Sequence, residues 1–284
     1  MQGRIIFQPL FECSLALALF TAGAQAQTPL PGADLERLVQ RVALYPDPLL
    51  AQVFTAATYS DQIPDAAKWA DEHHYLTGAA LVAAISSDHV PWDPSVQALL
   101  GFPSVLGMMA DDLNWTGQLG NAVLVQKSDV MLAVQRLRHK AWEFGYLRGD
   151  AHITVSNGVY IEILPTRPDY YVVPAYDPAV VFAAPKPGFV VGTAVSLGYG
   201  VSLGPALQSL GWARIHMTWD AGGWYIRDRL WGRTWANRAT YVHPSRPQEA
   251  AKRVETHELI ARSAKEKEEA RLGHPRAEEE HHHR

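Results

Sequence analysis

The sequence has almost no cysteine. Cys13 is its single example in 284 residues, and it lies within the first 26 residues. If that segment is removed, the remaining chain can form no disulfide and offers no thiolate to a metal ion. Leu10-Phe11-Glu12 also lacks the small residues expected before a lipidated cysteine. We therefore expect neither a disulfide framework nor a lipid anchor.

The sequence also has little net charge and lacks the common catalytic motifs. The formal net charge is −4, so no strongly basic field exists to attract nucleic acid, and no nucleic-acid partner is expected. Ser95 and Ser156 stand outside any Gly-x-Ser-x-Gly motif, which gives a serine hydrolase little support. No Gly-Lys-Ser/Thr phosphate loop is present, and no cofactor is expected.

The first 26 residues are typical of a secretory signal peptide. Arg4 supplies a positive start, Leu10–Ala22 is nearly all apolar, and Ala24-Gln25-Ala26 gives the small-x-small cleavage pattern. The apolar core is about a dozen residues, short of the roughly 20 that span a bilayer as a retained anchor. We expect an exported protein that is periplasmic or associated with the cell envelope.

Residues 33–148 predict an all-helical domain. Tyr45–Pro48 separates two helices, and Asp93 before Pro94 is a helix-start signal. The longest predicted helix runs from Trp115 to Tyr146 and carries an apolar stripe, with polar residues facing elsewhere. Those polar residues are Lys127, Gln135, Arg138, His139 and Glu143.

The pattern changes to β structure after Gly149. A β-hairpin region is predicted over 151–183, with a turn at Asn157-Gly158, where both residues can take positive φ. Tyr170–Val173 and Ala179–Phe182 are predicted as further short strands.

The rest of the chain divides into two parts. Residues 184–243 combine a Gly-rich apolar segment, in which 188–212 could associate with a membrane, with an aromatic β unit around the turn Asp220–Gly223. Residues 244–284 predict a charged, largely disordered tail. The expected fold class is therefore α+β, with an N-terminal all-helical domain, a small antiparallel β region and the tail.

Arginines and aromatic residues alternate in the aromatic β unit, and this pattern gives the candidate binding residues. Arginine pairs with phosphate, while aromatic rings stack on sugars or lie at lipid headgroups. A small aromatic core with solvated arginines is the alternative interpretation. The candidates are Trp224, Tyr225, Arg227, Arg229, Trp231, Arg233 and Trp235.

Other titratable residues have simpler explanations, and no catalytic or metal-ligating residue is assigned. Asp93, Asp111 and Asp112 could serve an acid–base hydrolase, but helix caps account for carboxylates at such positions. His73 and His74 end a cluster with Asp71-Glu72, and neighbouring helical residues point about 100° apart, which prevents all four from facing one ion. The histidines of 281–283 would bind metal weakly and without selectivity.

Several motifs in order resemble one known family, catalogued as domain of unknown function 3300 and found in exported proteins of Gram-negative bacteria. The resemblance covers roughly residues 35–183 and implies an envelope location but no particular reaction. The motifs include Tyr45–Val53 (YPDPLLAQV), Trp92–Val96 (WDPSV), Trp115–Gly120 (WTGQLG), Asp129–Met131 (DVM) and Tyr171–Pro178 (YVVPAYDP).

Together these features favour a non-enzymatic envelope protein that acts as a scaffold or binding module. Its expected partner is the membrane surface, a glycan or another envelope protein, and its oligomeric state is left open. Two alternatives remain at this point. One is a carboxylate-dependent envelope hydrolase, and the other is a metal-handling protein that uses its histidines.

Overall fold

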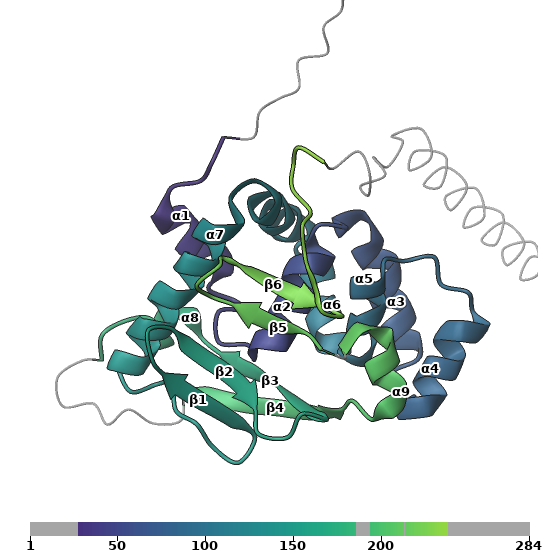
Figure 1. The fold of residues 1–284 in the computed structure, drawn as a ribbon. Coiled ribbons are helices and arrows are strands. Elements are labelled where there is room, and N and C mark those ends of the chain that lie inside the picture. Colours follow the sequence, from purple (N-terminus) through teal and green to yellow (C-terminus); the bar gives the residue numbers. More distant parts are fainter. Residues whose placement is uncertain (1–27, 186–193, 213, 238–284) are drawn as a thin grey trace, which may run out of the picture.

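A computed structural model describes residues 28–185, 194–212 and 214–237 (Figure 1). The predicted signal peptide and charged tail lie outside the described residues, as does part of the Gly-rich segment. Within the described residues, a helical N-terminal region over 32–143 is followed by three small antiparallel sheets. The α+β prediction is confirmed for this part of the chain.

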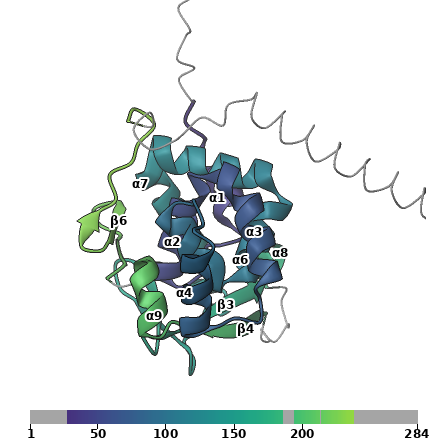
Figure 2. The same ribbon diagram turned by 90° about the vertical axis from the view of Figure 1, so that its right-hand side faces the viewer.

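The helical region, residues 32–143, consists of α1 to α7 and two short 3₁₀ helices, η1 and η2. Figure 2 shows α7 lying across the others, with β6 toward one side of the molecule and α8 toward the other. The elements are α1 (Gly32–Val39), α2 (Asp47–Ala57), η1 (Ser60–Gln62), α3 (Ile63–Glu72), α4 (Gly78–Ser87), α5 (Pro94–Ala98), η2 (Leu99–Gly101), α6 (Pro103–Asp111) and α7 (Leu113–Glu143).

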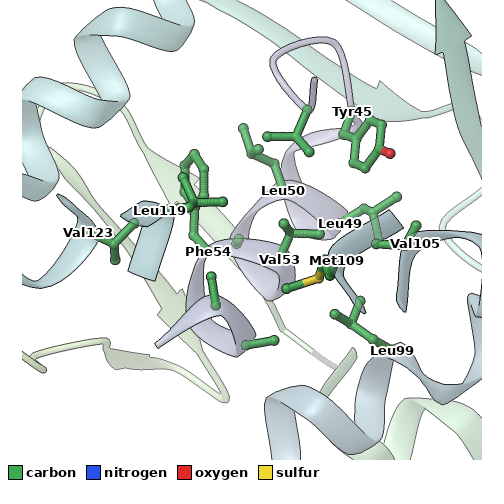
Figure 3. Close-up of a cluster of buried hydrophobic side chains, with 14 of the residues drawn as sticks. Tyr45, Leu49, Leu50, Val53, Phe54, Leu99, Val105, Met109, Leu119 and Val123 are labelled. Atoms are coloured by element: carbon green, nitrogen blue, oxygen red, sulfur yellow. The ribbon is translucent and has the colours of Figure 1, made fainter. Parts of the chain in front are cut away.

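Helix α2 is the centre of the core. All of its residues are buried, as expected of a helix that is apolar on nearly every side. Figure 3 shows its side chains, such as Phe54, among residues from α6 and α7 that include Met109 and Leu119. At Gly120 of α7 a Cβ atom would lie 2.1 Å from the Ala57 carbonyl oxygen, so glycine permits this close approach.

The predicted helix starts are confirmed by cap geometry. The Asp93 carboxylate accepts the Ser95 backbone N–H at 2.9 Å, and Pro94 occupies the first turn of α5. The Asp112 carboxylate accepts the Trp115 N–H at 2.9 Å and caps α7.

Helix α7 contains a kink at Gln126 (φ −144°, ψ 49°) that its sequence did not indicate. The Gln126 side chain bonds both the N–H and the carbonyl of Leu30. The Leu124 carbonyl accepts the backbone N–H of Trp235 at 3.0 Å. The kink is therefore where both ends of the described chain attach.

The prediction that Gln135 and Arg138 face away from the core is wrong. Both are buried, because the strand that begins at Ile161 covers this face of α7. The Gln135 amide exchanges two hydrogen bonds with the Ile161 backbone, at 3.0 and 2.8 Å. Periodicity within one helix could not reveal a strand that arrives from elsewhere in the chain.

Arg138 forms a buried ion pair with Asp47 that joins α7 to α2. The Arg138 guanidinium donates to Asp47 Oδ1 at 2.6 Å and to the carbonyls of Ala43, Tyr45 and Ile161. Trp219 Nε1 donates to Asp47 Oδ2 at 3.0 Å. The ion pair thus links α7 and α2 to the strand that begins at Ile161 and to Trp219.

A second, more exposed cluster joins α1 to α7. Arg136 and Lys140 each donate to the Glu36 carboxylate at 2.6 Å. Burial raises the pKa of Glu36, but these hydrogen bonds and charges outweigh burial and lower it below its ordinary value.

All the strand pairs are antiparallel. The hairpin of β1 and β2 packs on α2 and α7. Strand β5 also packs on α2. The sheets consist of β1 (Ile153–Asn157) with β2 (Ile161–Pro165), β3 (Tyr170–Tyr176) with β4 (Val195–Ser202), and β5 (His216–Thr218) with β6 (Gly223–Ile226) and β7 (Arg229–Leu230).

The β predictions need three corrections. The hairpin after Gly149 is confirmed, but Asn157 and Gly158 do not take positive φ, and Val159 is 85% exposed in the connecting loop. The expected strand at 179–182 is wrong, because Asp177 caps a short helix, α8 (Pro178–Val181). Strand β4 was not predicted, since its glycines disfavour strand structure.

The described part of the segment 188–212 forms β4, the short helix α9 (Pro205–Leu207) and the π-helical segment η3 (Gln208–Trp212). Of the helices in the described residues, none is both long enough and apolar enough to span a bilayer.

Candidate functional site

The predicted aromatic residues are only partly accessible. Trp224 is fully buried, and its Nε1 donates to Thr55 Oγ1 at 3.0 Å. Its ring stacks on that of Trp231, with centroids 4.9 Å apart. Lys127 Nζ lies over both rings and donates to the Trp231 carbonyl at 2.9 Å. These two indoles hold the third sheet to α2 and α7, and burial lowers the pKa of Lys127.

The other aromatic candidates also have structural partners. Tyr225 stacks on His216 with centroids 4.8 Å apart, and Trp235 is attached through its backbone to the kink in α7. Neither lines the cavity described next. The alternative of a small aromatic core with arginines at its edge therefore describes the positions of Trp224, Tyr225 and Trp235.

Four of the seven candidates line one cavity of about 430 Å³ between α2, the start of α5 and the β6–β7 unit. That volume falls in the range of about 300–1,000 Å³ typical of small-molecule sites. We call it the Gln52 cavity. Its described lining residues are Gln52, Thr55, Asp93, Pro94, Ser95, Gly211, Ile226, Arg227, Arg229, Leu230, Trp231, Gly232, Arg233 and Asn237.

Two buried polar atoms of residues that line this cavity, Gln52 Oε1 and Trp231 Nε1, have no hydrogen-bond partner in the described part of the chain. Gln52 is 1% exposed, and its Nε2 donates to the Gly211 carbonyl at 3.1 Å, but its Oε1 accepts no hydrogen bond from the described residues. Trp231 is 7% exposed, and its Nε1 has no acceptor among them. Buried polar atoms are usually hydrogen-bonded, so an acceptor and a donor left open in one cavity indicate a ligand site.

Asp93 occupies one side of the cavity and is held firmly. Its Oδ1 accepts from the Ser95 backbone N–H and from Ser95 Oγ at 2.6 Å, while its Oδ2 lies 3.3 Å from Arg233 Nη2. The Arg233 guanidinium lies over the Tyr59 ring, 4.7 Å from its centroid. Burial raises the pKa of Asp93, and the hydrogen bonds from Ser95 partly offset this rise.

Positive charge predominates in the lining. The described lining contains three arginines and one carboxylate, that of Asp93. Arg227 Nη2 donates to the neutral Ser209 carbonyl at 2.9 Å, and Arg229 is exposed at the rim. The neighbouring Asp228 carboxylate pairs with Arg214 at 2.7 Å. The cavity is therefore suited to a negatively charged ligand.

The remaining sequence candidates lie elsewhere. Asp111 and Asp112 do not line the cavity, and Asp112 pairs with Arg41 at 3.1 Å. His73 stacks on Trp69 with centroids 4.0 Å apart and lies 3.8 Å from Asp88. Across the described ranges, no three His, Cys, Asp or Glu residues are grouped so as to hold a metal ion. The histidines of 281–283 are outside those ranges.

The deepest residues of the cavity were missed from the sequence. Gln52 and Thr55 lie one turn apart on α2, which is otherwise apolar on nearly every side. A glutamine in so apolar a helix was the available signal, because a buried amide needs partners. Gly211, which holds the Gln52 amide through its carbonyl, gave no such signal.

Comparisons with known proteins support the resemblance found in the motifs. A family model described as "Protein of unknown function (DUF3300)" matches residues 32–268. The chain is 33% identical over 183 residues to the Uncharacterized protein YacH of Escherichia coli (strain K12), an alignment that covers 53% of this chain and 29% of YacH. The chain thus spans less than a third of the length of that relative. No solved structure matches the chain. Because the family match covers most of the sequence and the whole described cavity lining, this chain belongs to the DUF3300 family.

Proposed function

We propose that this chain is a non-enzymatic binding protein of the cell envelope and that the Gln52 cavity is its ligand site. The observation that carries the proposal is the open pair, Gln52 Oε1 and Trp231 Nε1, which belong to two residues that line one cavity and have no partner among the described residues. An unsatisfied buried polar atom costs about 1–3 kcal/mol, so a ligand that bonds both atoms gains affinity from them. The envelope location rests on the signal-like pattern of residues 1–26.

The cavity is better suited to binding than to hydrolysis. Acid–base hydrolysis of a glycosidic bond commonly uses two carboxylates on either side of the bond. Asp93 is the one carboxylate in the described lining, and both of its oxygens already have partners. Asp111 and Asp112, the other two acids of the hydrolase hypothesis, do not line the cavity, and Asp112 caps α7.

The helical region supports the site rigidly. Gln52 and Thr55 belong to α2, whose every residue is buried among the surrounding helices. Trp231 is fixed by its stacking on Trp224, which Thr55 holds through a hydrogen bond. Binding groups held in place before the ligand arrives lose little conformational entropy on binding.

In-cell photocrosslinking tests the proposal. A photoreactive amino acid would replace Leu230, which is 53% exposed and lines the cavity, or Val159, which is exposed on the hairpin loop as a matched control. We expect a mass-shifted adduct from position 230 that is absent at 159 and reduced by Gln52→Leu. Equal adducts at both positions, or none at 230, would contradict a ligand site in this cavity.

A further inference from the structure

We infer that the ligand of the Gln52 cavity is an anionic carbohydrate, a sugar ring that carries a carboxylate or a phosphate. The inference rests on the proposed function and specifies the chemistry of its ligand. It follows from three parts of the cavity, which are the open polar pair, the arginine rim and the apolar wall.

The open polar pair calls for a group that both donates and accepts. Gln52 Oε1 requires a donor, whereas Trp231 Nε1 requires an acceptor. A hydroxyl group does both at once, and a sugar ring presents several of them. Thr55 cannot take this role, because its Oγ1 already donates to the Ala51 carbonyl at 2.8 Å and accepts from Trp224 Nε1.

The arginine rim calls for an anion. Arg233 is engaged with Asp93, whereas Arg227 donates to a neutral carbonyl and Arg229 forms no ion pair within the described ranges. Asp228 lies between them in sequence, but its carboxylate pairs with Arg214. Within the described residues, the guanidinium groups of Arg227 and Arg229 thus have no carboxylate partner, and their planar donors match the oxygens of a carboxylate or phosphate.

The apolar wall suits the C–H faces of a sugar ring. Pro94, Ile226 and Leu230 contribute apolar side chains to the cavity lining. A free inorganic anion would leave this wall and the buried amide unused.

An anionic lipid surface fits less well than a sugar. Aromatic side chains that lie at lipid headgroups must be exposed, but Trp224 is fully buried and Trp231 nearly so. Gln52, at 1% exposed, belongs to the buried helix α2, whereas headgroup contacts form at an accessible surface. The observations therefore favour a soluble ligand that enters the cavity.

Isothermal titration calorimetry of the purified protein tests the inference. The probes are digalacturonate, galactose 1-phosphate, the neutral disaccharide galactobiose, inorganic phosphate and vesicles that contain phosphatidylglycerol. We expect digalacturonate or galactose 1-phosphate to bind at least about tenfold more tightly than galactobiose, since a charge-assisted hydrogen bond contributes about that factor. Raising the salt concentration should reduce this preference.

Three variants give the assay its controls. Arg229→Gln should remove the preference for the anionic sugar and leave weak binding of galactobiose. Gln52→Leu should weaken all sugars, and Arg167→Gln, which removes an exposed arginine outside the cavity lining, should change nothing. Arg229 is exposed, so its replacement leaves the folded protein available for measurement even if Gln52→Leu disturbs folding.

The outcomes separate the two proposals. Equal affinity for neutral and anionic sugars, or binding of vesicles or inorganic phosphate alone, would overturn the inference of an anionic carbohydrate. The proposed binding function would still stand if photocrosslinking gave an adduct at position 230. Preferential binding of an anionic sugar that Gln52→Leu leaves unchanged would place the sugar elsewhere and overturn the inference for this cavity.

Discussion

Replacing Arg138 by methionine should be among the most damaging single changes in the chain. Methionine has a similar length and fits an apolar core, but it cannot donate hydrogen bonds. Arg138 is 0% exposed and donates to the Asp47 carboxylate and to three backbone carbonyls. The substitution would leave a buried carboxylate without its counter-ion and would remove the Arg138 donor from the Ala43 and Tyr45 carbonyls, whereas the Ile161 carbonyl would keep its hydrogen bond from Gln135.

The expected loss is large relative to the stability of a domain. Removing one partner of a buried ion pair costs about 3–5 kcal/mol, and each carbonyl left unsatisfied adds about 1–3 kcal/mol, although such terms are not additive. A typical free energy of unfolding is about 5–15 kcal/mol. We therefore expect Arg138→Met to lose at least about 3 kcal/mol.

Urea unfolding followed by tryptophan fluorescence measures this loss, and Arg136→Met is the matched control. Arg136 lies two residues earlier on α7, is 43% exposed in its side chain and pairs with Glu36, so its replacement should cost about 0–1 kcal/mol. Adding Asp47→Asn to Arg138→Met should recover part of the loss, because the stranded charge is removed. If the two arginine variants unfold at the same urea concentration, the reasoning is refuted.

Two further predictions follow from the helix contacts. Gly120→Ala should destabilise by about 1–3 kcal/mol, because its Cβ would lie 2.1 Å from the Ala57 carbonyl, whereas Gly107→Ala in α6 meets nothing within 4 Å and should stabilise by about 0.5–1 kcal/mol. Urea unfolding checks this pair, because the midpoint should fall for Gly120→Ala and rise for Gly107→Ala. Equal shifts of the two midpoints would contradict the prediction. Because the pKa of Glu36 is lowered by folding, its stabilisation is present above the unfolded pKa and is lost as the pH falls through the folded value. Glu36→Gln should thus cost about 0.5–1 kcal/mol near neutral pH and nothing once the pH has fallen below the folded pKa of Glu36, and a cost that persists in strong acid would count against the assignment.

The features that depend on local sequence could be predicted. Asp93 before Pro94 marks a helix start because the carboxylate and the proline act within one turn, and the structure confirms it. The hairpin after Gly149 was likewise predicted from alternation over a few residues. Its turn geometry was not, because the Asn157-Gly158 signal competes with other loop lengths.

The features that depend on distant contacts could not be predicted. Arg138 was assigned to the polar face of α7, and only the arrival of Asp47 and Ile161 from elsewhere in the chain makes its burial favourable. Strand β4 was missed because its pairing with β3 spans two segments separated in the sequence and because Gly198 and Gly200 lower its strand propensity.

The candidate site was predicted in part for the same reason. Arg227, Arg229, Trp231 and Arg233 were identified because they follow one another closely along the chain, and they share one cavity. The opposite wall comes from α2, more than a hundred residues earlier, so Gln52 could not be linked to them by spacing.

The most direct test of the proposed site is the indole N–H signal of Trp231 in a two-dimensional ¹H–¹⁵N NMR spectrum, assigned through Trp231→Phe. Trp219 serves as the internal reference, because its indole N–H already donates to Asp47 and neither residue lines the cavity. On titration with an anionic sugar, the Trp231 signal should shift and saturate while the Trp219 signal stays in place. A Trp231 signal that does not move while the sugar binds elsewhere on the protein would contradict the Gln52 cavity as the ligand site.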